Sequence, residues 1–408
     1  MSDADLRPLI EGLGAPPVRR PLIRPAVARL ASDQLGLRHA TWLELFYDLV
    51  FVVTVAELAN NLSRDVSWTG VLEYIFLFIP VIWVWAGTTF YADRFDPDDA
   101  VHRGLTALQM IAVCALAVSV HDGLGDTSRA FALSYVAART TLLLMYVRAY
   151  RSARDAEYRP MISRYLRGFG LAALIWFASA FVPTPARFFM WGIALVVDIW
   201  TPLGMRRLQL LTPLDRSHLS ERFGLFVIIV LVESVIGVVG GLAEQNLNTS
   251  SVIGALFAMV VAVSIWWVYF DEPDDTAVQR LGLAGQVWIY SHMPLLMAIA
   301  ASGVAIEHVL ANDEVLPADR WLLCGAFAAT MTATAVIHLT SLTDRRDVLR
   351  HTSAWWRLGA AALLLLLGVL GASLESAILL AVAASICFSQ VVLDVAFDVH
   401  EDRELVTS

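Results

Sequence analysis

The sequence predicts an all-α integral membrane protein with about 12 transmembrane helices, arranged as two parallel six-helix repeats whose N- and C-termini both lie in the cytosol. Three observations support this prediction: the apolar composition, the apolar runs and the distribution of arginine. Hydrophobic residues make up 58% of the 408 residues and charged residues 16%, and the mean hydropathy is +0.63. Soluble domains are about 45–50% apolar and about 25% charged, and they avoid large exposed apolar patches. Contact with a lipid bilayer explains the excess of apolar residues.

Twelve apolar runs approach the length of about 20 residues that a helix needs to cross a bilayer. Because backbone groups in lipid must be hydrogen-bonded within their own segment, each run is predicted to be a helix. The eleventh run is the shortest. Once the spans and the two ends of the chain are assigned, about ten residues remain for each loop, which leaves no room for a soluble catalytic domain. The runs lie at residues 42–60, 71–91, 104–121, 131–150, 165–183, 187–204, 222–242, 251–270, 284–306, 320–340, 357–372 and 375–394.

The arginines predict the orientation of these spans, since cytosolic loops carry an excess of basic residues. All 29 basic residues are arginine. With a cytosolic N-terminus, 24 of them fall in cytosolic segments and 4 on the opposite side, alternating loop by loop, and Arg139 lies within a span. We therefore expect both termini in the cytosol and the protein in the inner (plasma) membrane as a multi-pass protein.

The chain divides into five predicted segments. Residues 1–41 contain six arginines, five prolines and no apolar core, which indicates a disordered cytosolic arm. The two six-helix repeats cover residues 42–204 and 222–394. A cytosolic linker, 205–221, joins them, and residues 395–408 form a cytosolic tail.

Matched polar positions indicate the internal repeat. The segment 83–109 has two tryptophans, an aromatic–Asp element, a Pro-Asp-Asp turn and a glutamine at spacings that resemble the segment 266–286. Asp198 and Asp394 lie at matching places in the last span of each half. Because six spans is an even number, both halves insert the same way up, which makes the repeat parallel.

Ionisable residues at membrane depth cost about 2.5–3.5 kcal/mol each, so each is a candidate site residue. The densest group is in the first span: Glu44, Asp48 and Glu57. Glu44 and Asp48 are four residues apart and share one helix face, whereas Glu57 lies near the opposite surface. Two such carboxylates can share a proton or bind a cation together. Alternatively, Glu44 lies among the lipid headgroups and pairs with an arginine such as Arg38.

Further candidates lie in the other spans. Arg139 lies close to the bilayer centre, so an acidic partner is expected, and Asp48, Glu233 and Asp198 are nearest to it in depth. This ion pair can be structural or functional. Glu233 lies near the middle of the seventh span, where it cannot reach the surface. Asp198 and Asp394 are expected close enough to the cytosolic surface to be wet.

Other chemistry has little support in the sequence. His292 lies deep in the ninth span, where a lone histidine is more often a hydrogen-bonded core residue than a ligand. No two histidines have metal-ligand spacing on one helix, so neither a metal nor another cofactor is predicted. The net charge of −9 and the absence of a basic patch argue against nucleic-acid binding. There is no phosphate loop and no Gly-x-Ser-x-Gly motif, so an enzyme has no positive support.

Two stretches resemble the bacterial low temperature requirement protein A family. The first runs from Ala40 to Phe51 and contains Glu-Leu-Phe-Tyr-Asp, and the second runs from Ser220 to Ser234, where Val232 stands in place of the glycine of the family pattern. The resemblance covers about residues 38–400. It implies that the family-pattern acids in this chain are Glu44, Asp48, Glu221 and Glu233. The family is named for a growth phenotype in the cold, so the resemblance implies a topology but no reaction.

Three functions remain open at this point. Two parallel halves with acids in spans one and seven favour a secondary transporter, in which Asp48 and Glu233 bind a proton or cation that is coupled to an unknown small solute. By analogy alone, Phe46-Tyr47-Asp48 is similar to the Phe-Ser-Asp motif of a potassium-channel family built from six-helix repeats, which suggests a cation channel. The third option is a membrane enzyme or accessory protein in lipid or stress adaptation. The lipid bilayer and a small solute or cation are the expected partners, and a homo-oligomer is an option.

Overall fold

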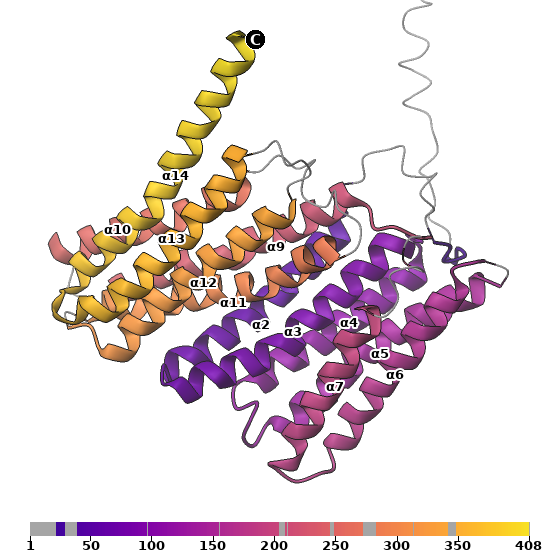
Figure 1. Ribbon diagram of the computed structural model, residues 1–408. Helices are drawn as coiled ribbons and strands as arrows, with labels where there is room; N and C mark the ends of the chain where they lie inside the picture. Colours follow the sequence, from indigo (N-terminus) through magenta and orange to yellow (C-terminus); the bar gives the residue numbers. More distant parts are fainter. Residues whose placement is uncertain are drawn as a thin grey trace, which may run out of the picture.

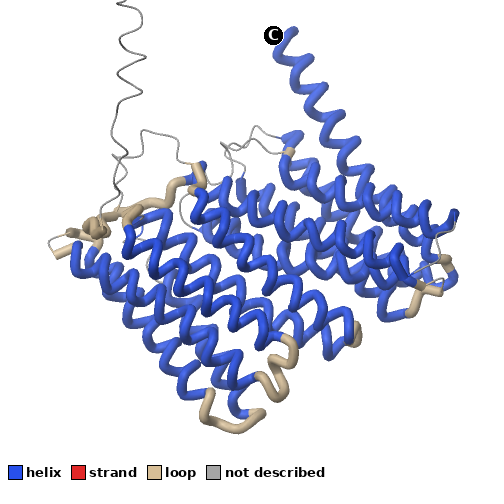
Figure 2. The backbone as a smooth tube through the Cα atoms, turned by 180° about the vertical axis from the view of Figure 1, so that it is seen from behind, coloured by secondary structure: helices blue, strands red, loops and turns tan. Residues whose placement is uncertain are grey.

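The computed structural model describes residues 22–28, 39–95, 97–154, 156–203, 209, 211–244, 249–271, 283–312, 314–341 and 348–407. In this part of the chain, twelve long α-helices are joined by loops and no β-strand is present (Figures 1 and 2). The first half comprises α2 (Trp42–Arg64), α3 (Trp68–Phe95), α4 (Ala100–Val120), α5 (Ser128–Ser152), α6 (Arg159–Ser179) and α7 (Ala186–Leu203). The second half comprises α9 (Arg216–Glu244), α10 (Thr249–Phe270), α11 (Leu283–Ala311), α12 (Pro317–Ser341), α13 (Val348–Leu370), the short 3-10 turn η2 (Gly371–Ser373) and α14 (Ser376–Thr407).

The prediction of an all-α polytopic membrane protein is confirmed. Among the described residues, 10 helices are long and apolar enough to cross a membrane. The two other long helices, α2 and α6, are not among these ten. Each helix extends beyond its predicted apolar run at one end or at both ends. The shortest predicted run, 357–372, lies mostly within α13, which has 23 residues.

The two halves lie side by side, and their contact positions the candidate site (Figure 1). Helices α2 and α3 of the first half pack against α9 and α11 of the second. One bond across this junction joins the Tyr74 hydroxyl to the backbone carbonyl of Met297, at 2.8 Å. The predicted linker lies at the same junction: residues 204–208 and 210 are outside the described residues, and α9 already begins at Arg216.

Helices α9 and α11 approach each other so closely that their backbones are in contact. A Cβ atom added to Gly237 would lie 2.1 Å from the carbonyl oxygen of Gly303, and one added to Gly303 would lie 2.4 Å from that of Glu233. Only glycine fits at such a contact, and small residues of this kind commonly join transmembrane helices. The glycines therefore hold Glu233 against α11.

Contacts at the helix ends show which ends share a side of the molecule. The end of α2 meets the end of α11 through Ser63 and His308, and the start of α14 meets the same end of α11 through Ser376 and Asn312. The start of α2 and the end of α14 therefore lie together at the opposite side. An even number of spans produces this arrangement. The assignment of that side to the cytosol stays a prediction.

Part of the predicted arm packs on the helices. The backbone amides of Ala26 and Ala28 donate to Ser152 and Tyr158, both at 3.1 Å, at the end of α5 and just before α6. The segment 22–28 therefore packs against the first half. The parts of the predicted arm at residues 1–21 and 29–38 lie outside the described residues.

Candidate functional site

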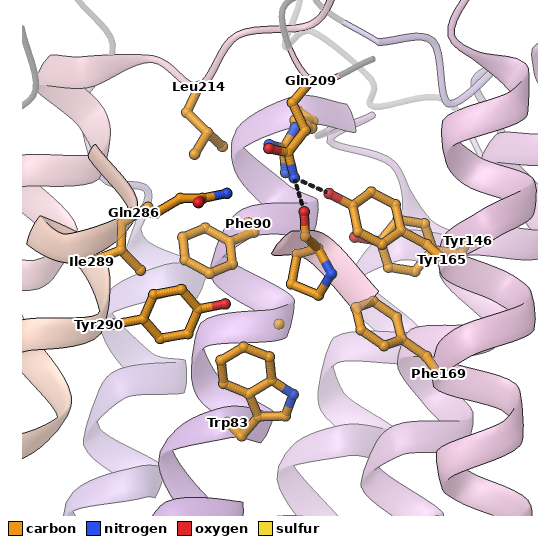
Figure 3. Close-up of a pocket in the computed structure, with 13 residues that line it drawn as sticks. Trp83, Phe90, Tyr146, Tyr165, Phe169, Gln209, Leu214, Gln286, Ile289 and Tyr290 are labelled. Atoms are coloured by element: carbon orange, nitrogen blue, oxygen red, sulfur yellow. Dashed lines mark hydrogen bonds between the residues drawn. The ribbon is translucent and has the colours of Figure 1, made fainter. Parts of the chain in front are cut away.

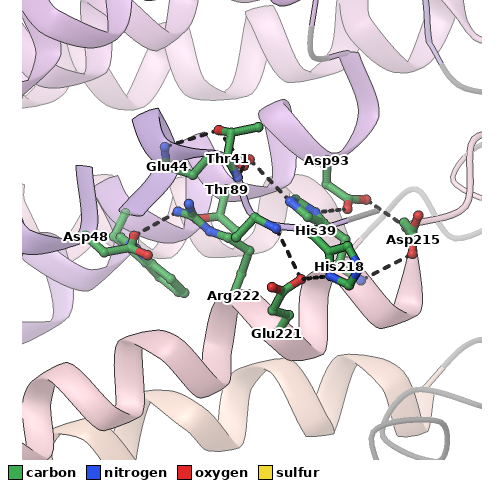
Figure 4. Close-up of polar contacts among 12 residues, drawn as sticks. His39, Thr41, Glu44, Asp48, Thr89, Asp93, Asp215, His218, Glu221 and Arg222 are labelled. Carbon is green, nitrogen blue, oxygen red and sulfur yellow. Dashed lines mark hydrogen bonds and ion pairs between the residues drawn. The ribbon is translucent and has the colours of Figure 1, made fainter. Parts of the chain in front are cut away.

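Five charged or titratable side chains gather where the two halves meet (Figure 4). They come from the start of α2, the end of α3 and the start of α9. All five are buried, with exposed fractions between 0% and 9%. We refer to them as the junction cluster: Glu44, Asp48, Asp93, His218 and Arg222.

An ion pair between Asp48 and Arg222 lies at the centre of the junction cluster. Arg222 Nη2 donates to Asp48 Oδ1 at 2.8 Å, and the indole N–H of Trp85 donates to the same oxygen at 2.7 Å. Asp48 is 0% exposed and Arg222 is 1% exposed. Among the described residues, Asp48 Oδ2 and Arg222 Nε and Nη1 have no hydrogen-bond partner. The pair therefore keeps unused capacity for a proton, water or a small ligand.

His218 lies between two carboxylates. Its Nδ1 lies 2.8 Å from Asp93 Oδ1, and its Nε2 lies 3.3 Å from Glu44 Oε1. The other oxygen of Asp93 accepts the backbone amide of Asp215 at 2.9 Å, and Asp215 in turn accepts the His218 amide at the start of α9. The imidazole is hydrogen-bonded to Asp93 through Nδ1 and lies within ion-pair distance of Glu44 through Nε2, so it links α9 to both α2 and α3.

Glu44 has two roles at this place. Its Oε2 accepts the backbone amide and the hydroxyl of Thr41, at 2.8 and 2.9 Å, which completes a capping box at the start of α2. Its other oxygen faces His218. The alternative partner suggested by the sequence, Arg38, lies outside the described residues. The cap fixes the position of Glu44, so the carboxylate is held in place for the histidine.

The junction cluster contains three carboxylates, one guanidinium and one imidazole. Asp48 Oδ2 is buried and has no hydrogen-bond partner among the described residues, so it is the cluster's open position for a proton or a small cation. At its outer edge, Glu221 accepts the Ala40 amide at 3.1 Å, beside His39.

Two of the other ion pairs contain residues predicted from the sequence, and each lies within one half. Arg139 on α5 pairs with Asp198 on α7 at 2.5 Å, and Tyr135 donates to the same carboxylate at 2.8 Å. Of the three acids that the sequence offered to Arg139, the fold brings Asp198 to it. In the second half, Asp394 on α14 pairs with Arg357 on α13 at 3.3 Å. Both aspartates are buried, at 0% and 5% exposure, and not wet as expected. Each pair joins two helices of one half, and neither shares a residue with the junction cluster.

The other predicted residues occupy different surroundings. Glu233 on α9 is 7% exposed and lies against Gly303, and its Oε1 has no hydrogen-bond partner among the described residues. His292 is held by the Tyr269 hydroxyl at 2.9 Å and the Trp288 carbonyl at 2.8 Å, which is the environment of a core histidine. Glu57 is half-buried on α2, well along the helix from the junction cluster. The structure thus brings Glu44 and Asp48 together but keeps Glu57 and His292 apart from them.

A small cavity lies between the halves near the junction cluster (Figure 3). Its volume is about 70 Å³, and six of its 13 lining residues are aromatic. The first half contributes residues of α3, α5, α6 and α7, the second half contributes three residues of α11, and two residues come from the segment between the halves. Polar groups enter from Gln209, which donates to the Tyr165 hydroxyl at 3.0 Å, and from Gln286 and Arg94. Its lining is Trp83, Gly87, Phe90, Arg94, Tyr146, Tyr165, Phe169, Pro202, Gln209, Leu214, Gln286, Ile289 and Tyr290.

The sequence model of the bacterial low temperature requirement A protein (LtrA) family matches residues 39–396. The chain belongs to this family. A curated relative, the uncharacterized protein RA0937 of Rhizobium meliloti (strain 1021), is 27% identical over 303 residues, which cover 70% of this chain and 73% of the relative. The match includes all twelve helices except the last part of α14, so the whole bundle is the LtrA unit.

The structure relates the family-pattern acids to the junction cluster. Glu44 and Asp48 are part of it, Glu221 lies at its edge, and Glu233 lies further along α9. Asp93, His218 and Arg222 are not among the candidates predicted from the sequence. A signal is present, since His218 and Arg222 are four residues apart and share one face of a helix that also carries a family-pattern acid. The predicted linker 205–221 contains His218, and Arg222 is the first residue of the seventh apolar run.

Proposed function

We propose that this LtrA protein is a proton-coupled secondary transporter of a small solute in the inner (plasma) membrane, with the junction cluster as its proton site. The single observation that supports the proposal most is the ion pair of Asp48 and Arg222, which is buried where the two halves meet. Among the described residues, Asp48 Oδ2 has no hydrogen-bond partner, so this oxygen is where the cluster accepts a proton. A site of this kind loads and releases protons when its surroundings change.

The position of the junction cluster supports coupling of protonation to conformation. Its three acids come from the first half, whereas His218 and Arg222 come from the second. Any movement of one half relative to the other changes the distances between these charges. Protonation therefore biases the equilibrium between two arrangements of the halves, which is what a coupled carrier requires.

The packing of the helices is in keeping with two parallel six-helix repeats. In the first half α2 packs on α4, α4 on α5, α5 on α6 and α6 on α7. The helices at the same positions of the second half form the same series of contacts: α9 with α11, α11 with α12, α12 with α13 and α13 with α14. We infer that the halves are repeats and that both termini are cytosolic, as the arginine distribution favours.

The cavity between the halves is the proposed solute site. Its volume of about 70 Å³ has room for about two water molecules. We infer that the solute is small and partly apolar, that it enters when the halves separate, and that it makes polar contacts with Gln209, Gln286 or Arg94. Glu233, buried deeper along the junction, is the second carboxylate on the proposed proton path.

The test uses the purified protein in liposomes that contain a pH-sensitive dye. Amino acids, organic acids, sugars and nucleosides are added in turn outside, and the pH inside is recorded. We expect one class of solute to drive proton movement in the wild type. Asp48→Asn and His218→Gln should reduce the rate at least about 10-fold, since each removes a group of the proton site. The matched control is Asp98→Asn, which removes an exposed carboxylate (45% side-chain exposure) at the same end of the molecule.

Two results would overturn the proposal. A sustained proton current without any solute, lost in Asp48→Asn, would make the protein a channel. Solute-driven proton movement that survives both Asp48→Asn and His218→Gln would place the proton site elsewhere.

A further inference from the structure

A serine, a histidine and an aspartate are linked in series at the end of the bundle opposite to the junction cluster. Ser63 Oγ in the last turn of α2 lies 2.8 Å from His308 Nε2 near the end of α11. His308 Nδ1 lies 3.0 Å from Asp319 Oδ1 in the first turn of α12. The three residues come from both halves, and the order of contacts is hydroxyl, imidazole, carboxylate.

The geometry assigns a role to each group. Asp319 is only 2% exposed, and its carboxylate oxygen can only accept, so the hydrogen on His308 is placed at Nδ1. The lone pair of Nε2 then points at the Ser63 hydroxyl, which donates to it. A serine whose proton is held by an oriented imidazole is an activated nucleophile, and such triads are recognised by geometry and not by sequence order.

The site is open to a reactant. Ser63 is half-buried, and the side chain of His308 is 22% exposed. Asn60 is exposed and lies one helical turn before Ser63, so its amide can donate to an oxyanion formed at the serine. Leu316 and Trp321, on either side of Asp319 in sequence, are 58% and 37% exposed and offer apolar surface.

We propose that Ser63, His308 and Asp319 form a catalytic triad that hydrolyses carboxylic esters of fatty acids. The ends of membrane-spanning helices lie at the level of the headgroups, where the ester bonds of lipids also lie. The exposed side chains of Leu316 and Trp321 lie at the same end of the bundle and suit an acyl chain. This activity is separate from the proposed transport, because none of its residues belongs to the junction cluster.

The reaction is an ordinary acyl transfer to water. Ser63 Oγ attacks the carbonyl carbon of the ester, and its proton passes to His308 Nε2. The bond to the alcohol oxygen breaks, and the alcohol leaves with that proton. Water then attacks the acyl-serine in the same way, which releases the carboxylic acid and restores the serine. Ester and water become acid and alcohol, and no electrons are transferred.

The test is labelling of the full-length protein in detergent micelles with a fluorophosphonate probe, which reacts with activated serines. We expect labelling of the wild type and the modified peptide, located by mass spectrometry, to contain Ser63. Labelling should be absent in Ser63→Ala and at least about 100-fold slower in His308→Gln and Asp319→Asn, since each removes the base or its orientation. The control is Ser67→Ala, because the Ser67 hydroxyl accepts the Gly70 amide and is not part of the triad.

The second measurement is hydrolysis of p-nitrophenyl octanoate by the same set of folded variants. We expect it to follow the labelling rates, with octanoate cleaved faster than acetate. Absence of label on Ser63 in the wild type, or equal labelling rates in the wild type and His308→Gln, would overturn the proposal. Asp48→Asn should label like the wild type, so a failure of the transport proposal leaves this result unchanged.

Discussion

Removal of the Arg222 guanidinium should be one of the most damaging single changes in the protein. The perturbation is Arg222→Met, which keeps an unbranched apolar stem and removes the charged guanidinium. It leaves the Asp48 carboxylate buried with only the Trp85 indole as a donor among the contacts described above. Breaking a buried ion pair in this way typically costs about 3–5 kcal/mol.

The distance and the burial set the magnitude. Two unit charges 2.8 Å apart interact by about 6 kcal/mol at an effective dielectric constant of about 20. The desolvation of both groups offsets part of this attraction in the wild type. In Arg222→Met, Asp48 can bind a proton instead, which limits the loss. We therefore expect a decrease in the free energy of unfolding of about 3 kcal/mol at neutral pH.

The assay is equilibrium unfolding by sodium dodecyl sulfate in mixed micelles, followed by circular dichroism, for Arg222→Met, Asp48→Asn and the double variant. We expect the double variant to be far less destabilised than the sum of the single effects. Effects that add within about 0.5 kcal/mol would refute the reasoning, since they would mean that the two charges do not interact.

The fold offers a matched control for this cycle. Arg103 and Asp98 form an ion pair of nearly the same length, 2.9 Å, but their side chains are 40% and 45% exposed. Exposed pairs contribute about 0–1 kcal/mol. Arg103→Met should therefore have little effect, and a loss as large as that of Arg222→Met would show that burial does not decide the magnitude.

Two further predictions concern packing and pH. Gly303→Ala should destabilise the protein by about 1–3 kcal/mol, because its Cβ would lie 2.4 Å from the Glu233 carbonyl oxygen. Gly325→Ala, whose Cβ would have no neighbour within 4 Å, should stabilise the protein by up to about 1 kcal/mol. The same unfolding assay checks both variants, and equal effects would contradict the close approach of α9 and α11. Asp99 caps α4, and although its burial opposes ionisation, hydrogen bonds from Arg148 and from backbone amides outweigh that effect and lower its pKa below the ordinary value of 3.8. A lowered pKa contributes stability that is complete above pH 3.8 and is lost as the pH falls through the folded value, so the difference in Tm between the wild type and Asp99→Asn should shrink below pH 3.8. A difference that stays constant into that range would contradict the assignment.

Much of the fold can be predicted from the sequence because the hydropathy of a segment is a local property that does not depend on what the segment packs against. Every predicted apolar run became most of one helix, including the short one at 357–372. The same local argument required an acidic partner for Arg139. It could not choose among Asp48, Glu233 and Asp198, since all three lie at similar depth. Because α5 packs beside α7, Arg139 pairs with Asp198, whereas Asp48 pairs with Arg222.

The candidate site was only half predictable for a related reason. Glu44 and Asp48 are visible as acids in an apolar run, but His218 and Asp93 lie at polar helix ends that look like loops. Asp215 starts α9 one residue before Arg216, so His218 lies within the helix and next to Asp93. Whether a helix end is wet or buried depends on which other ends converge on it, and local hydropathy contains no information about that.

The sequence by itself determined the class of the protein, its helices and its family, because these depend on composition, periodicity and local pattern. Only the tertiary structure decided which charges meet. Arg222 is 174 residues from Asp48, and His308 is 245 residues from Ser63. Partners so far apart in sequence are brought together by the packing of whole helices. Two residues must lie at the same depth in the membrane to meet, but equal depth alone does not determine which residues do.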